Sequence, residues 1–269
     1  MGTSFAQFAV QRDVPLVFYD AQPEGGFLRA KLPGANVEFV QGDILDLPAL
    51  LHAMTKHRVD TVVHTAGLIG NKVADAPYTG VSINVLGTIN VLEAVRLAGV
   101  RRLVHISSLS VYDQRRDCPA PLCEDFPRGN GRLYDNTKAA KELMVEAYQR
   151  LYGFEVIALR LAKLYGLGNF HGGSSGGRLI QTLVQCALRG EVLTFEELVR
   201  AIRRVLPSLE VEVQPGPPPP LQVKQPLDLS RAREMLGWEP RYTMEAGFRD
   251  FVADLEEAGT RRLTPPGPL

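Results

Sequence analysis

A serine, a tyrosine and a lysine in this sequence have the types and the spacing needed to move a proton on and off an alcohol. Ser108 follows Ser107 at the end of an apolar run, and Tyr134 precedes Lys138 by four positions. A helix would place Tyr134 and Lys138 on the same face. Free tyrosine has a pKa of about 10, and a nearby ammonium group lowers this pKa by stabilising the phenolate. The three residues therefore predict acid–base chemistry on a hydroxyl or carbonyl group.

A tyrosine and a lysine four residues apart also occur by chance in many proteins, so the interpretation depends on the surrounding elements. Short β-branched or apolar segments alternate with segments of helical period, which is typical of a parallel sheet covered by helices. The expected strands are 16–20, 37–43, 61–67, 102–108 and 155–161. The expected helices are 3–12, 47–56, 84–98, 134–152, 230–236 and 243–257.

Two acids stand at the ends of the first two expected strands. Residues at such ends gather along one edge of a parallel sheet, where ligands bind. Asp20 could accept both hydroxyls of an adenosine ribose and would repel a 2′-phosphate, which favours NAD over NADP. Asp43, followed by Ile44, could accept a hydrogen bond from the adenine amino group. Taken alone, either acid is more often a solvated loop residue.

Small residues close the next expected strand. Thr65, Ala66 and Gly67 would let a cofactor approach the backbone closely. His64, just before them, is expected to be a packed histidine rather than a ligand. Asn84 has two interpretations: it caps a helix, or it positions backbone or water near the site.

The composition excludes several classes of protein. Thirty basic and thirty acidic residues cancel, so no overall field attracts nucleic acid or an anionic membrane. Three cysteines without zinc-like spacing predict neither disulfides nor a structural metal, but reduced thiols. No apolar run approaches the length of a membrane span, and no secretory signal precedes the first strand. We therefore expect a cytoplasmic enzyme with no metal and with a small-molecule substrate.

Segments through most of the chain resemble the extended short-chain dehydrogenases/reductases of the NAD-dependent epimerase/dehydratase family, with sugar-nucleotide epimerases as a reference. The matching segments are LVFYD, VQGDILD, VVHTAG, NVLGTINVLEA, HISSLSVYD, YDNTKAAKE, LRLAKLYG and LDLSRAREMLGWEP. The resemblance implies a Rossmann-like, doubly wound parallel sheet of the α/β class, NAD as the cofactor and a nucleotide sugar as the substrate.

The resemblance also implies roles for individual residues. The catalytic residues would be Ser108, Tyr134 and Lys138, with Lys138 also holding the nicotinamide ribose. Ser108 and Lys163 would contact the substrate, although Lys163 stands where the family commonly has Asn and is about equally consistent with a solvated loop lysine. The expected cofactor contacts are Gly2, Asp20, Asp43, Ile44, Thr65, Ala66, Gly67, Asn84, Ser107, Tyr134 and Lys138. Family members pair through the helices that match 84–98 and 134–152, which implies a homodimer.

The chain departs from the family pattern in two places. The family opens with a strand and a Gly-x-x-Gly-x-x-Gly turn that binds pyrophosphate. Gly2 fits only the last of these glycines, so we expect the first strand, which would lie mid-sheet, to be missing. Several dozen family residues are also missing near Leu193. We therefore expect an incomplete NAD-binding domain over 1–165 and an incomplete, mainly helical substrate-binding region over 166–269.

Three functions remain open at this point. The first is NAD-dependent epimerase/dehydratase chemistry on a nucleotide sugar. The second is a reductase of the same family that acts on a non-nucleotide carbonyl. The third is a truncated, catalytically silent member, because the missing phosphate turn removes a large part of the cofactor site.

Overall fold

The computed structural model describes residues 1–22, 31–32, 35, 37–113, 116–117, 119–129, 131–162, 164, 166 and 226–260. The chain divides into two compact units. One contains Met1–Asp117, Asp125–Leu164 and Gly259–Leu269, and the other contains Cys118–Glu124 and Tyr165–Ala258. The expected gap near Leu193 lies outside the described residues.

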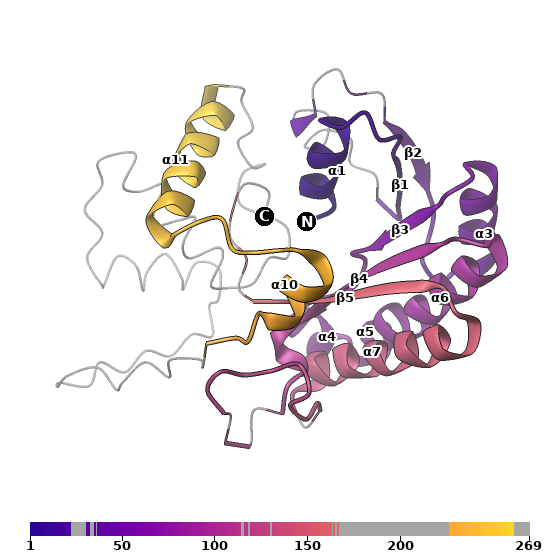
Figure 1. Ribbon diagram of the computed structural model, residues 1–269. Helices are drawn as coiled ribbons and strands as arrows, with labels where there is room; N and C mark the ends of the chain where they lie inside the picture. Colours follow the sequence, from indigo (N-terminus) through magenta and orange to yellow (C-terminus); the bar gives the residue numbers. More distant parts are fainter. Residues whose placement is uncertain are drawn as a thin grey trace. The chain divides into compact units, whose positions relative to one another are not determined.

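The described residues of the first unit contain five strands, which pair in parallel (Figure 1). Strand β1 (Val17–Asp20) pairs with β2 (Glu38–Gln41). Strands β3 (Thr61–His64), β4 (Arg102–Ser108) and β5 (Glu155–Leu161) form a second sheet with β4 in the middle. All five correspond to expected strands, and β4 and β5 have the expected bounds. The α/β class with a parallel arrangement is confirmed.

The two sheets are separate among the described residues, because no strand pairs with both β1 and β3. The break falls where the sequence predicted a missing central strand. A central strand of a doubly wound sheet is buried on both faces. Val63 of β3 is instead 40% exposed, so β3 has the surroundings of a sheet edge.

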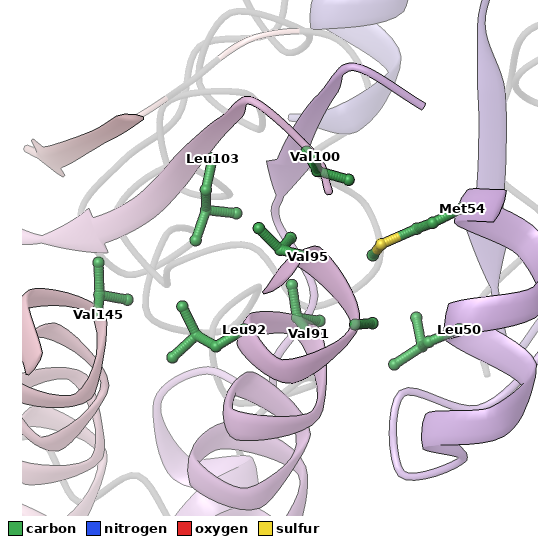
Figure 2. Packing of buried hydrophobic residues seen from close by; sticks show 9 residues of the cluster. Leu50, Met54, Val91, Leu92, Val95, Val100, Leu103 and Val145 are labelled. Carbon is green, nitrogen blue, oxygen red and sulfur yellow. The ribbon is translucent and has the colours of Figure 1, made fainter. Parts of the chain in front are cut away.

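The same unit contains helices α3 (Leu47–Lys56), α6 (Gly87–Ala98) and α7 (Leu133–Tyr152). Helix α1 (Gly2–Val10) forms a small core with β1 and β2. The main core joins apolar residues of α3, α6, α7 and β4 (Figure 2). These residues are Leu50, Met54, Val91, Leu92, Ala94, Val95, Val100, Leu103 and Val145. Tyr19 and Ile44 pack against this core, so side chains connect the two sheets.

Helices α6 and α7 both end at glycines, as the sequence predicts. The backbone of Gly99 after α6 has φ 68°, and that of Gly153 after α7 has φ 75°. Only glycine adopts this left-handed conformation without a steric penalty, and it ends the helix in a way that satisfies its last carbonyls.

The segment between β3 and α6 contains helical residues before position 84 that were not predicted. It forms α4 (Asn71–Asp75), α5 (Pro77–Val81) and a π-helix over Ser82–Leu86. Helix α5, the π-helix and α6 form one helical stretch, Pro77–Ala98. By length and composition alone, this stretch is apolar enough to cross a membrane. Val91, Leu92, Ala94 and Val95 of its α6 part lie in the core described above, which accounts for much of this composition.

In the second unit, α10 (Ser230–Leu236) and α11 (Met244–Thr260) are the described helices. A bridge joins Leu122 and Leu227, where the Leu122 amide donates to the Pro226 carbonyl at 2.8 Å. Helix α10 ends at Gly237, as predicted. The described part of this unit is therefore mainly helical.

Asp46 caps the start of α3, since its side chain accepts a hydrogen bond from the Ala49 amide at 2.9 Å. We expect Asp46→Ala to lower the free energy of unfolding by about 1 kcal/mol, because that amide loses its partner. Urea unfolding measures the change. Asp46→Asn keeps an acceptor oxygen and is the control, so an equal loss in both variants would contradict a capping contribution.

Candidate active site

The packing of α7 on β4 brings the three predicted catalytic residues together. Ser108 ends β4, and its hydroxyl lies close enough to the Tyr134 phenol to influence the pKa of that phenol. Lys138 is 7% exposed, and its Nζ donates to the Ile106 carbonyl at 2.9 Å. The Lys138 Nζ also lies 5.9 Å from the centre of the Tyr134 ring. One hydroxyl, one phenol and one amine thus meet at the carboxyl end of β4.

Burial dominates the electrostatics of this group. Burial raises the pKa of Tyr134 above its ordinary value, and the nearby Ser108 hydroxyl opposes the rise. Burial also lowers the pKa of Lys138 to about 8, while the Glu142 carboxylate opposes the fall. At neutral pH, Tyr134 therefore keeps its proton and Lys138 is mostly an ammonium. The sequence predicted a lowered pKa for Tyr134; in the structure, desolvation outweighs any attraction to Lys138.

Glu142, one turn after Lys138, was missed by the sequence reasoning. Its carboxylate is 2% exposed and accepts hydrogen bonds from the Ser107 hydroxyl at 2.5 Å, from Arg160 at 2.7 Å and from Arg128 at 2.9 Å. Burial acts to raise the pKa of Glu142, but the hydrogen bonds from Arg160 and Ser107 outweigh it, so the pKa is lowered. The Ser107 side chain is therefore bound to Glu142, which leaves its backbone for the predicted cofactor contact.

The Asn84 side chain forms hydrogen bonds with the backbone of the loop after β3 and does not cap a helix. It lies inside the π-helix and is fully buried. Its side-chain oxygen accepts from the Leu68 amide at 2.8 Å, and its Nδ2 donates to the Leu68 carbonyl and to Thr137 Oγ1, each at 3.0 Å. The positioning interpretation is the one that the structure supports. The adjacent residues Ala66 and Gly67 are exposed, so their backbone is open to a ligand.

The other predicted residues lie along the same edge. Asp20 and Asp43 are exposed at the ends of β1 and β2, and each accepts from a backbone amide two residues later at 2.9 Å. The Ile44 side chain packs towards α6: a Cβ added to Gly87 would lie 2.8 Å from it. Its backbone is therefore the part left for a cofactor. His64 is packed as expected, with its Nε2 3.0 Å from Thr88 Oγ1.

Comparison with known proteins decides the family. The model of the NAD dependent epimerase/dehydratase family matches residues 1–203. The chain belongs to this family. The cofactor of the epimerase/dehydratase family is NAD.

Several relatives are nucleotide-sugar enzymes. A UDP-glucose 4-epimerase of Mycolicibacterium smegmatis is 28% identical over 260 residues, which cover 80% of this chain and 82% of that enzyme. A dTDP-glucose 4,6-dehydratase of the same organism is 36% identical over 172 residues, which cover 62% of this chain and 51% of that enzyme. The chain thus resembles both reaction types of the family.

Solved structures of epimerases share the fold. The UDP-glucose 4-epimerase of Thermotoga maritima, solved with UDP-glucose, superposes with a TM-score of 0.73 at 18% identity and covers 96% of both chains. The UDP-glucose 4-epimerase of Thermus thermophilus, solved with NAD, gives 0.70 at 22% identity, with 96% of both chains covered. At these identities the likeness supports the Rossmann-like fold of the epimerase/dehydratase family.

The residues at the carboxyl edge fit the cofactor of the epimerase/dehydratase family. The start of α1 lies against both sheets, since a Cβ added to Gly2 would lie 3.6 Å from Thr65 Oγ1 and 3.9 Å from Phe18. The first amides of a helix have no partner within it and suit a phosphate. The exposed Asp20 suits a ribose, and the exposed backbone at Gly67 allows close approach. The donors and acceptors needed for NAD are thus present along one edge.

Two predicted features complete the description. Lys163 lies outside the described residues, so its substrate contact stays a prediction. Within the described ranges, no group of three His, Cys, Asp or Glu side chains could hold a metal ion.

Proposed function

We propose that this chain carries out NAD-dependent epimerase/dehydratase chemistry on a nucleotide sugar, with Tyr134 as the acid and base. The observation that carries the proposal is the meeting of Ser108, Tyr134 and the buried Lys138 at the carboxyl end of β4, with the Lys138 Nζ 5.9 Å from the centre of the Tyr134 ring. NAD, when bound, supplies the acceptor for the hydride of the substrate carbinol.

Each residue of the trio has a role that follows from its surroundings. Ser108 Oγ accepts from the Ser110 amide at 3.2 Å, so its own proton is available to orient a substrate oxygen. Tyr134 can give its proton to a ketone oxygen or, as the phenolate, take one from an alcohol. Lys138, with a pKa of about 8, is mostly charged at neutral pH and stabilises the phenolate as it forms.

The nucleotide sugar is inferred from the relatives, which are UDP-glucose epimerases and dTDP-glucose dehydratases. We also propose a homodimer through α6 and α7. Leu97, Leu143 and Leu151 on these helices are 49%, 50% and 73% exposed, which is apolar area that a second copy can cover. The cytoplasmic location and the division into domains at residue 165 stay predictions.

The substrate class is tested by incubating the purified chain and NAD with UDP-glucose or dTDP-glucose and separating the products by chromatography. We expect conversion of at least one of these sugars and none of a steroid or flavonoid ketone. Conversion of such ketones with no turnover of any UDP-, GDP- or dTDP-sugar would instead show the reductase of the same family.

The break between β1 and β3 favours a second candidate, a catalytically silent member of the family. Calorimetric titration with NAD separates the two candidates. Tight binding rules against the silent member, whereas no heat of binding at millimolar NAD supports it.

A further inference from the structure

Lys141 is a buried lysine that the proposed chemistry does not use. It lies on the inner face of α7, three residues after Lys138, and is 1% exposed. Its Nζ donates to the Ala66 carbonyl at 3.3 Å. Lysine is almost never fully buried unless it is paired, so this placement is costly for the fold.

The surroundings of Lys141 do not neutralise its charge. The titratable groups that affect it or that it affects are His64 of β3, His105 of β4 and Lys138 of α7, and each is a cation when protonated. Lys141 forms no ion pair with an acid in the described part of the chain. The neighbouring Glu142 is bound to arginines instead. Burial, and then Lys138, hold the pKa of Lys141 well below its ordinary value.

What Lys141 contacts is the loop after β3. Lys141 donates a hydrogen bond to the Ala66 carbonyl, and the Asn84 side chain forms hydrogen bonds with the Leu68 amide and carbonyl. Gly67 lies between them with φ 151°, and a Cβ there would lie 2.9 Å from Asn84 Oδ1 and 3.5 Å from Lys141 Nζ. Side chains of α7 and of the π-helix thus bind the backbone of residues 66–68, while Ala66 and Gly67 are exposed to solvent.

We propose that Lys141 is a positioning residue of the cofactor edge, whose amine holds the Ala66 carbonyl so that the Ala66–Gly67 backbone is ordered for NAD. The inference rests on the proposed function, because NAD must bind at this edge. The role requires an N–H donor at this place. An apolar side chain of similar size fills the same space, suits the buried surroundings better and leaves the carbonyl without this bond.

The test compares Lys141→Met with Lys141→Gln in thermal unfolding and in calorimetric NAD titration. We expect Lys141→Met to raise the unfolding midpoint, because a buried amine is removed, and to raise the Kd for NAD about tenfold. Lys141→Gln retains an N–H donor and should keep the Kd within about threefold of the unmodified chain. Lys56→Met, at the end of α3, is the control and should change neither quantity.

The opposite directions of the two effects identify positioning. A lysine with a merely structural role would lower the midpoint and the affinity together, and that result overturns the proposal. An unchanged Kd in Lys141→Met, or equal losses in the methionine and glutamine variants, overturns it as well.

Amide hydrogen exchange gives a readout that needs no NAD. We expect faster exchange at Gly67 and Leu68 in Lys141→Met, and unchanged exchange contradicts the positioning role. Failure of the unmodified chain to bind NAD overturns the proposed function, and the exchange rates then decide whether Lys141 still orders the loop.

Discussion

Tyr134→Phe removes a single oxygen atom and is expected to lower turnover by at least about 100-fold. The substrate loses its proposed proton donor and acceptor. The ring remains, so the packing of α7 and the Kd for NAD should change little. The measurement is kcat with whichever nucleotide sugar the unmodified chain converts, together with a calorimetric titration of NAD.

A tyrosine on the same helix provides the control for this substitution. Tyr148 packs against the main core, towards the opposite end of α7 from Tyr134. Tyr148→Phe should therefore leave kcat within about twofold, because it touches no reacting atom. Turnover of Tyr134→Phe at the level of this control would remove Tyr134 from the catalytic step.

Glu142→Ala is expected to have the largest effect on stability, with a loss of about 3–5 kcal/mol in the free energy of unfolding. The substitution leaves the guanidinium of Arg160, which is 14% exposed, without its buried carboxylate. It also removes the acceptor of the Ser107 hydroxyl, next to Ser108 of the candidate site. Unfolding in guanidinium chloride at pH 7 measures the loss.

Glu146 offers a matched comparison one turn later on α7. It pairs with Arg128 but is 40% exposed, so Glu146→Ala should cost about 1 kcal/mol or less. Equal losses at the two positions would contradict the importance of burial. Because the fold lowers the pKa of Glu142, its contribution is present above the ordinary glutamate pKa and is lost as the pH falls through the lowered value.

The proximity of Ser108, Tyr134 and Lys138 could be predicted because its signals are local. Tyr134 and Lys138 share a helical face by spacing alone, and Ser108 ends a strand whose apolar run marks it clearly. The bounds of β4 and β5 follow from the same kind of run. The pKa of Tyr134 could not be predicted, because desolvation depends on how α7 lies against β4.

Glu142 and Lys141 were not predicted, because their burial depends on contacts with residues far away in the sequence. Glu142 would be taken for a solvated acid in any helical pattern, and only the placement of Arg160 on β5 shows that it is buried. Lys141 is hidden in the same way by its contact with Ala66, 75 positions earlier. The helices α4 and α5 have five residues each, which is too short for a periodic pattern to indicate them.

The residues of the candidate site belong to two separate sheets. Ser108, Tyr134 and Lys138 all belong to the three-stranded sheet and the helix that covers it, whereas Asp20 and Asp43 belong to the pair β1 and β2. Packing of side chains such as Ile44 against α6, rather than a shared backbone ladder, joins these halves. Under the proposed function, the acids that recognise adenosine and the groups that transfer the proton thus lie on separate sheets, which side-chain packing joins.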